Sequence, residues 1–409
     1  MRVTAVTYGT EGDARPLAAL CRALIDAGHD ARLLADEATL STARALGVPA
    51  SPLSGDILAA LKPGGAMSGA IGRGGGFGDT AAALARVANA NCQAWMAEVL
   101  AAAEGSDGLL VCGLAAFVGF SVAERLGVPA IGAGLIPITP TAAFPSPFLP
   151  PGLTPRWLNR ASFTLVNDVL WRSFREAVNE ARRTVCGLPP RERVWTDHPM
   201  LYGLSPGLIP RPGDWPANVH VCGQWTVAAS DWAPPPALEA FLHAGSPPVY
   251  VGFGSMAGFE PRAMLNEIIA GLKGRRAVFY AGWSGAETVD LPASVLAIGD
   301  TPHDWLFPRV SAVVHHGGSG TSHSAARAGR PSVVIPFAGD QFFWADRLRA
   351  AGVAPPRLHG RRLRADALAR GLDLAGTAAM VGRAAALGDL IVQEDGPGRG
   401  VALLASLLA

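Results

Sequence analysis

The sequence lacks an excess of charge of either sign. Its 409 residues include 34 Lys and Arg against 33 Asp and Glu, which gives a formal net charge of +1. Proteins that bind nucleic acid by electrostatics usually carry a strong positive field. The balance therefore argues against a nucleic-acid partner and favours a small molecule or another protein.

Cysteines are also scarce, and their number is odd. The five are scattered, with no CxxC pair and no histidine at zinc spacing. This pattern argues against a disulfide framework or a zinc centre and predicts reduced, buried thiols. The positions are Cys21, Cys92, Cys112, Cys186 and Cys222.

No segment offers about 18 unbroken apolar residues, the length that a membrane helix needs. The longest candidate, LLVCGLAAFVGF at residues 109–120, is shorter and is followed by Glu124 and Arg125. The chain starts directly with a strand-like run, VTAVTY, rather than with a signal peptide. We therefore expect a cytoplasmic protein without a transmembrane segment, which leaves room for transient membrane contact.

The first half of the chain alternates strand-like and helix-like segments. Residues 3–8 and 30–36 have strand character and enclose an amphipathic helix over 17–29, closed by Gly28. Such a βαβ unit has parallel strands and a right-handed crossover. The strands LLVCG and PAIGA repeat the pattern, whereas the glycines of residues 61–79 indicate a loop.

The second half repeats this organisation after a stretch rich in proline and tryptophan. The series PVYVGFGSM, RAVFYAGW, SVLAIGD, SAVVHH and SVVIPF predicts a second parallel sheet. We expect an α/β protein with two facing doubly wound, Rossmann-like domains: 1–207, a linker at 208–236, 237–390 and a C-terminal helix at 391–409. The carboxyl ends of the two sheets should share a cleft, which is the expected active site.

The most informative segment is HHGGSGT, residues 315–321, between a buried strand and a helix. Its glycines expose backbone N–H groups at a helix start, where the helix dipole favours an anion. The hydroxyls of Ser319 and Thr321 and the imidazole of His316 add donors. This combination predicts a cradle for a diphosphate.

Other interpretations of the glycines remain open. A Walker loop would need a lysine before the hydroxyl residue, and this segment has none. Gly318, Gly320 and the distant Asp340 partly satisfy a dinucleotide fingerprint, but His323 occupies its third glycine position. A glycine turn without any ligand is the remaining alternative.

The segments around HHGGSGT resemble those of a known family. The run at 300–348, containing HDWLFP, HHGGSGT and GDQFFWA, resembles the C-terminal signature of two-domain (GT-B) glycosyltransferases. It is most similar to sterol 3-beta-glucosyltransferases and to bacterial enzymes that glycosylate macrolide and glycopeptide antibiotics. Segments 9–16, 201–225 and 247–256 extend the resemblance over nearly the whole chain.

The resemblance implies an inverting reaction in which an acceptor hydroxyl displaces a nucleoside diphosphate from the anomeric carbon of a sugar. Asp13 in GTEGDARP matches the family's general base; its structural alternative is an N-cap of the helix that carries Pro16. The family usually has arginine where this chain has Glu11, so a contact there is in doubt. An exposed Glu11 is the simpler interpretation, and a preference for amine-bearing substrates is the other.

Several positions match nucleotide-sugar contacts of the family. They are Ser255, Trp283, His303, His316, Gly318, Ser319, Gly320, Thr321, Asp340 and Gln341. Asp340 and Gln341 would hold sugar hydroxyls or simply solvate a loop, Ser255 could instead cap a helix, and Trp283 could be core. Because no DxD acid pair occurs, the resemblance implies metal-independent chemistry with a UDP- or dTDP-sugar as co-substrate and no cofactor. His29 is expected to be an ordinary surface residue.

The sequence says least about the acceptor. Phe77, Phe117 and Phe144 lie in apolar or glycine-rich segments of the first domain and would line its half of the cleft. They suggest a large apolar molecule with a hydroxyl, such as a sterol, polyketide or antibiotic aglycone, although each could be plain core. A sugar-nucleotide epimerase and a non-catalytic binding protein of the same fold remain alternatives.

Overall fold

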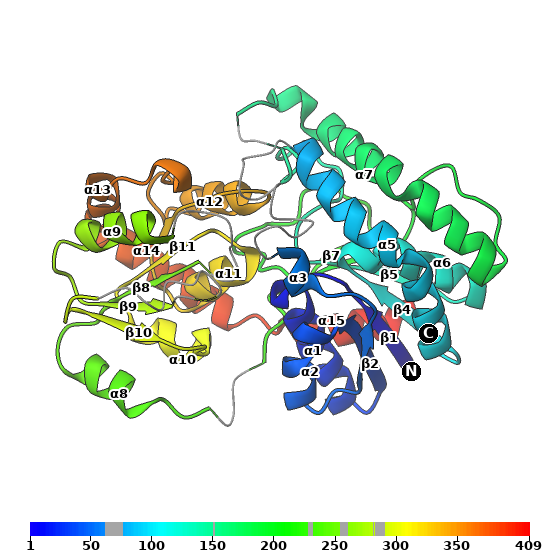
Figure 1. The fold of residues 1–409 in the computed structure, drawn as a ribbon, viewed down its shortest axis with the longest axis horizontal. Helices are drawn as coiled ribbons and strands as arrows, with labels where there is room; N and C mark the ends of the chain where they lie inside the picture. Colours follow the sequence, from blue (N-terminus) through cyan, green and yellow to red (C-terminus); the bar gives the residue numbers. More distant parts are fainter. Residues whose placement is uncertain (62–76, 150–151, 228–231, 254–260, 281, 283–290) are drawn as a thin grey trace. The chain divides into compact units, whose positions relative to one another are not determined.

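The computed structural model describes residues 1–61, 77–149, 152–227, 232–253, 261–280, 282 and 291–409. Its contacts divide the chain into two compact units. Unit 1 comprises Met1–Thr226 and Asp395–Ala409, and unit 2 comprises Val227–Glu394. Each unit has one parallel sheet with helices on both faces (Figure 1), so the expected α/β fold class is confirmed.

Unit 1 contains a seven-stranded sheet in the order β3-β2-β1-β4-β5-β6-β7. The strands are β1 (Arg2–Val6), β2 (Asp30–Asp36), β3 (Ala50–Leu53), β4 (Gly108–Val111), β5 (Ala130–Gly134), β6 (Met200–Tyr202) and β7 (Val219–Val221). The helices are α1 (Glu11–Asp26), α2 (Ser41–Ala45), α3 (Ile57–Leu61), α5 (Phe77–Ala103), α6 (Ala116–Leu126), α7 (Asn159–Ala181) and α15 (Gly396–Leu407). Short helical turns are η1 (Glu37–Thr39), η2 (Gly113–Ala115), η3 (Arg156–Leu158) and a π-helical turn, η4 (Arg182–Cys186).

The predicted βαβ unit at the start of the chain is confirmed. β1 pairs with β2 in parallel, from Arg2 opposite Asp30 to Val6 opposite Leu34. Gly28 ends the connection to β2 with φ of 82°, a left-handed conformation that glycine adopts without strain.

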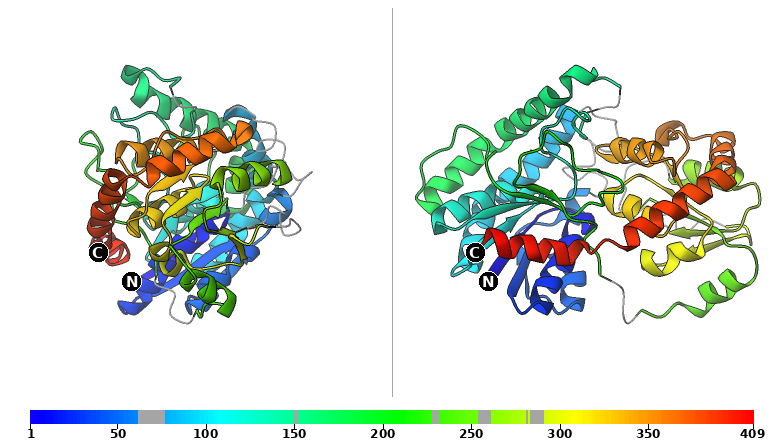
Figure 2. Two further views of the ribbon diagram at one scale, coloured as in Figure 1. Left: turned by 90° about the vertical axis from the view of Figure 1, so that its left-hand side faces the viewer. Right: turned by 180° about the vertical axis from the view of Figure 1, so that it is seen from behind.

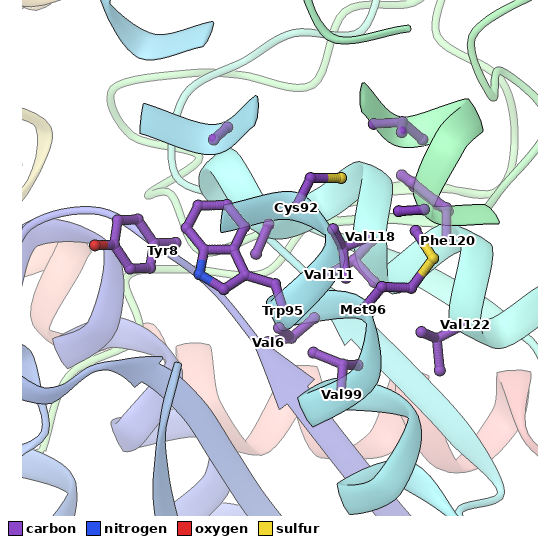
Figure 3. Packing of buried hydrophobic residues seen from close by; sticks show 14 of the residues in the cluster. Val6, Tyr8, Cys92, Trp95, Met96, Val99, Val111, Val118, Phe120 and Val122 are labelled. Carbon is purple, nitrogen blue, oxygen red and sulfur yellow. The ribbon is translucent and has the colours of Figure 1, made fainter. Parts of the chain in front are cut away.

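The core of unit 1 fills both faces of its sheet. On one face, α5 and α6 cover β1 and β4, and the ring of Tyr8 lies 4.3 Å from that of Trp95, centroid to centroid (Figure 3). Met96, Val111 and Phe120 continue this cluster. Because two sheet faces are covered, the strands are apolar on both sides, as in other parallel sheets.

Unit 2 contains a five-stranded parallel sheet in the order β10-β9-β8-β11-β12. The strands are β8 (Val249–Gly252), β9 (Ala277–Tyr280), β10 (Val295–Ile298), β11 (Ala312–His315) and β12 (Ser332–Val334). The helices are α8 (Pro236–His243), α9 (Pro261–Leu272), α10 (His303–Leu306), α11 (Ser319–Arg327), α12 (Gln341–Ala350), α13 (Ala365–Ala375) and α14 (Ala378–Val392). Two 3₁₀ turns, η6 (Phe307–Arg309) and η7 (Gly360–Arg362), complete it.

The linker differs from the one that composition predicted. The prolines and tryptophans of 208–236 predicted an interdomain linker, but residues 208–226 belong to unit 1 and include β7. β7 is a three-residue strand at the sheet edge, where nearby prolines are tolerated. The rings of Trp215 and Trp225 are buried in the unit. At the other end, Pro236 already begins α8.

The C-terminal helix packs on the first unit. α15 lies against α1 (Figure 2, right). Leu404 is buried among the residues of that face, and Gly400 is close to Leu20. The predicted helix at 391–409 is in fact the end of α14 followed by α15. Among the described residues no single helix is long and apolar enough to cross a membrane, although one bent pair, 365–375 with 378–407, meets the criterion jointly.

Candidate active site

The HHGGSGT segment lies at the topological switch point of the unit 2 sheet. β8 leads outward to β9 and β10 on one side, whereas β11 leads to β12 on the other. His315, the last residue of β11, is paired with Gly252, the last residue of β8. Open parallel sheets bind ligands outside the carboxyl ends of the two strands at such a reversal.

The turn after β11 requires glycine by its geometry. Gly317 has φ of 94°, and a Cβ added there would lie 2.8 Å from both the Gln341 carbonyl oxygen and Val334 Cγ1. A Cβ on Gly318 would lie 2.5 Å from Nε2 of His316. Gly317 and Gly318 therefore allow the chain to turn tightly beside the His316 ring, while Gly320 is exposed and a Cβ added there would meet no atom of the described residues within 4 Å.

The helix that follows begins at the predicted position. Gly318 is the N-cap of α11, and Ser319, Gly320 and Thr321 form its first turn. The N–H groups of a first helical turn have no acceptor within the helix and carry the positive end of its dipole. Ser319, Gly320 and Thr321 are all at least partly exposed. An anion at this helix start would gain roughly 0.3–1 kcal/mol from the dipole, and up to about 2 kcal/mol where water is excluded.

The two histidines are both held neutral. Burial lowers the pKa of His316 to about 4. The pKa of His315 lies well below its ordinary value because of burial first, and then because of the neighbouring His316 and His303. Burial thus disfavours the protonated, positively charged form of both imidazoles. An anion bound beside them would favour that form.

Each of these imidazoles has a buried nitrogen without a hydrogen-bond partner in the described part of the chain. For His316 it is Nδ1, although the ring as a whole is partly exposed. For His315, Nδ1 accepts the Gly317 N–H at 3.1 Å, which places the proton of the neutral ring on the unpartnered Nε2. A buried polar atom left unpaired costs about 1–3 kcal/mol, so each one needs an explanation such as an absent ligand.

His303 begins α10 and lies within electrostatic reach of His315. Its ring stacks on Phe307 with a centroid distance of 4.2 Å and meets Tyr250 edge to face at 6.0 Å. The aromatic neighbours hold the half-buried imidazole in place. The structure thus places His303 near His315.

Asp340 and Gln341 occupy the start of α12. Gln341 is buried, and its Oε1 accepts the backbone N–H groups of Phe337 at 2.8 Å and Ala338 at 3.2 Å. Its carbonyl therefore fixes the loop after β12, which leaves its hydrogen-bond capacity toward a sugar to the amide N–H groups. Its predicted contact with a sugar hydroxyl stays a prediction.

The carboxylate of Asp340 is oriented by a tryptophan. Nε1 of Trp344 donates to Asp340 Oδ2 at 2.8 Å. Trp344 is fully buried and meets the ring of His323 edge to face at 4.9 Å. Nδ1 of His323 in turn donates to the Ser319 carbonyl oxygen at 2.8 Å. These contacts connect Asp340 to the first turn of α11.

In unit 1, Asp13 follows β1 at the corresponding switch point. β1 and β4 are neighbours, with Val6 opposite Val111. From this pair the strand order runs to β2 and β3 on one side and to β5, β6 and β7 on the other. The alternative prediction was that Asp13 is the N-cap of α1. The N-cap is Thr10 instead. Asp13 is instead the third helical residue of a capping box, and its Oδ2 accepts the Thr10 N–H at 2.8 Å.

The surroundings of Asp13 favour its protonated form. Burial raises the pKa of its carboxyl, and the hydrogen bonds from Thr10 only partly oppose that effect. The pKa of the Cys112 thiol is raised mainly by burial, with a smaller contribution from the Asp13 carboxylate. Glu11 contacts Arg15 at 3.5 Å, so its charge is locally balanced. A carboxyl with a raised pKa at a switch point has the character of a general base.

The predicted acceptor residues lie in packed surroundings. Phe117 is half-buried in α6 among Trp171, Phe174 and Trp195, with ring centroids 5.3–6.2 Å away. Phe144 is buried 6.2 Å from Phe163. Phe77 begins α5. Both placed side chains thus contribute to packing, and their predicted contact with an acceptor stays a prediction.

Other predicted residues lie outside the described part of the chain. These are Ser255, Trp283 and most of the glycine-rich loop 61–79. Within the described ranges no group of three or more His, Cys, Asp or Glu is placed to hold a metal ion. Sequence reasoning included His315 and Gly317 in the HHGGSGT segment without giving either a role of its own, and it overlooked Trp344. The four-residue spacing of Asp340 and Trp344 at a helix start was the available signal for this tryptophan.

Comparisons with known proteins agree with this arrangement. Residues 276–386 match the family described as erythromycin biosynthesis protein CIII-like, C-terminal domain. The sterol 3-beta-glucosyltransferase of Neurospora crassa is 33% identical over 97% of this chain, and that of Arabidopsis thaliana is 34% identical over 87%. The chain spans 26% of the first relative and 60% of the second.

Solved structures show the same fold over the whole chain. Spinosyn rhamnosyltransferase SpnG has a TM-score of 0.68 at 21% identity, with all of both chains covered. The glycosyltransferase VinC, solved in complex with dTDP, has a TM-score of 0.69 at 20% identity and covers 100% of this chain and 99% of its own. The chain therefore has the two-sheet GT-B fold of these glycosyltransferases, and its resemblance to sterol 3-beta-glucosyltransferases and to bacterial antibiotic glycosyltransferases is confirmed.

Proposed function

We propose that the chain is an inverting, metal-independent glycosyltransferase that moves a sugar from a UDP- or dTDP-sugar to a hydroxyl of a large apolar small molecule. One observation carries the proposal: at the unit 2 switch point, two neutral imidazoles, each with a nitrogen that has no partner among the described residues, adjoin the exposed start of α11. A diphosphate would satisfy these donors and the helix dipole together. The dTDP complex of VinC supports the same class of donor.

In the proposed reaction, Asp13 accepts the proton of the acceptor hydroxyl as its oxygen bonds to the anomeric carbon. The bond from that carbon to the diphosphate breaks, and its electron pair leaves with the diphosphate oxygen. His316, His315 and the amides of residues 319–321 stabilise the negative charge that develops there. The donors of the protein thus perform the role that a bound cation performs in other transferases.

Asp340 and Gln341 hold the sugar in this proposal. Trp344 already occupies Oδ2 of Asp340, so that carboxylate meets the sugar in one fixed orientation. Ser255 and Trp283 remain proposed contacts to the phosphates and the base, and His303 to the ribose. Sterols and polyketide-type aglycones are the proposed acceptors, supported by the sterol 3-beta-glucosyltransferases and by SpnG, which was solved with spinosyn aglycone.

The test is product formation with a matrix of donors and acceptors. UDP-glucose, dTDP-glucose and a dTDP-deoxysugar are each incubated with a sterol, a macrolide aglycone or no acceptor, with and without EDTA, and the products are identified by mass spectrometry. We expect a glycosylated acceptor in at least one donor–acceptor pair and no effect of EDTA. An altered sugar nucleotide without acceptor would support an epimerase instead, and turnover abolished by EDTA would contradict metal-independent transfer.

A further inference from the structure

Unit 1 exposes large apolar side chains at the N-terminal end of α7. Leu153 is 72% exposed, Trp157 in η3 is 82% exposed, and Leu165 in α7 is 59% exposed. Isolated exposed apolar residues are common on protein surfaces. Three within 13 positions, one of them a nearly fully exposed tryptophan, form a patch that has to be explained.

The exposed residues follow the outer face of the helix. In α7, Asn159, Phe163 and Val166 are buried, whereas positions 161 and 165, four residues apart, are exposed; Trp157 lies in the η3 turn directly before the helix. Positions at this spacing lie on one side of a helix. The inner side already packs into unit 1, so the outer side would be polar in an ordinary surface helix. Figure 1 shows α7 as a long helix along the border of unit 1, beside α5.

The charges that accompany this face are basic. Arg156 and Arg160 are exposed, and no acidic residue occurs between positions 152 and 167. Asp168 is the first acid along the helix. Asp214, in a nearby loop, has a lowered pKa. The main causes are the hydrogen bonds from the Thr141 hydroxyl and the Ala142 N–H, and the charge of Arg160 contributes less. The patch therefore carries a local positive charge in a chain whose formal net charge is only +1.

We propose that the face formed by Leu153, Arg156, Trp157, Arg160 and Leu165 docks unit 1 reversibly on an anionic lipid bilayer. Tryptophan prefers the boundary between headgroups and acyl chains, leucines extend just below it, and arginines contact lipid phosphates. A second copy of the chain fits less well. A two-fold contact would bring together two copies of the same positively charged patch, which repel each other. This proposal is independent of the transferase function.

The experiment is co-sedimentation of the full chain with two kinds of vesicle, phosphatidylcholine alone and phosphatidylcholine with phosphatidylglycerol. We expect measurable binding to the anionic vesicles only. Trp157→Ser should lower the partition coefficient about tenfold, as loss of one buried large apolar side chain predicts. Arg156→Glu should lower it at least about fivefold at low salt, since each interfacial arginine contributes on that order.

Leu390→Ser is the matched control, because Leu390 is 67% exposed on α14 in unit 2. It should leave vesicle binding unchanged, and circular dichroism should show that all variants are folded. Failure of the wild-type chain to bind anionic vesicles, or equal loss in Leu390→Ser, would overturn the proposal. So would light scattering that shows a wild-type dimer dissociated by Trp157→Ser, since a second copy would then cover the face.

Discussion

Replacing Asp13 by asparagine and by alanine separates its two roles. In the capping box, Asp13 Oδ2 accepts the Thr10 N–H at 2.8 Å. Asparagine keeps an oxygen acceptor at this position, whereas alanine leaves the N–H unpaired. The loss of one such cap interaction costs about 0.5–2 kcal/mol, typically about 1 kcal/mol.

Both variants should lose the general base. We expect kcat to fall about 10²–10⁴-fold for Asp13→Asn and for Asp13→Ala alike, as is usual when a positioned base is removed. Affinity for a nucleoside diphosphate should be unchanged in both, because the proposed cradle is in unit 2. Only Asp13→Ala should lose about 1 kcal/mol in the free energy of unfolding, measured by urea denaturation at neutral pH.

The pH dependence has opposite signs for activity and stability. Because burial raises the pKa of the Asp13 carboxyl, kcat/KM should increase as pH rises through that raised value and the base ionises. The folded state binds this proton more tightly than the unfolded state does, so the stability from protonated Asp13 is lost over the same rise. Asp13→Asn should abolish both effects. Turnover of Asp13→Asn at the wild-type rate would refute Asp13 as the base.

Three further predictions concern unit 2. Gly317→Ala should lower its free energy of unfolding by roughly 2–4 kcal/mol, since φ is 94° and the new Cβ would lie 2.8 Å from the Gln341 carbonyl; an unchanged denaturation midpoint would contradict this. Trp344→Phe should raise KM for the sugar nucleotide about 3–10-fold, through one lost hydrogen bond to a carboxylate. The inhibition constant of the free nucleoside diphosphate should stay constant, and a parallel change in both would indicate a general structural defect. Stability should fall as pH drops from the ordinary histidine value of 6.5 to about 4, because the fold keeps His323 neutral; His323→Asn should lose less than wild type over this range.

Local patterns in the sequence predicted those features that depend on neighbouring residues. The buried run before HHGGSGT and the glycines within it placed β11, the turn and α11 correctly, because a strand-to-helix turn leaves few choices. The same holds for Gly28 after α1. Fold class followed from the alternation of such units.

Features that depend on distant packing were missed. β7 forms in a stretch rich in proline because it completes the edge of a sheet assembled by other segments. α15 returns to α1, a choice that its own apolar sequence left open. The sequence also could not tell which imidazole nitrogens lack partners, since that depends on the side chains buried around His315 and His316.

The central claim is that the turn after β11 binds a diphosphate, and isothermal titration calorimetry with UDP and dTDP tests it most directly. Wild type should bind at least one of them with EDTA present, and His316→Ala should weaken that binding about tenfold or more, as loss of a hydrogen bond to a charged group predicts. A dissociation constant unchanged in His316→Ala, or binding that requires a divalent cation, would contradict the claim.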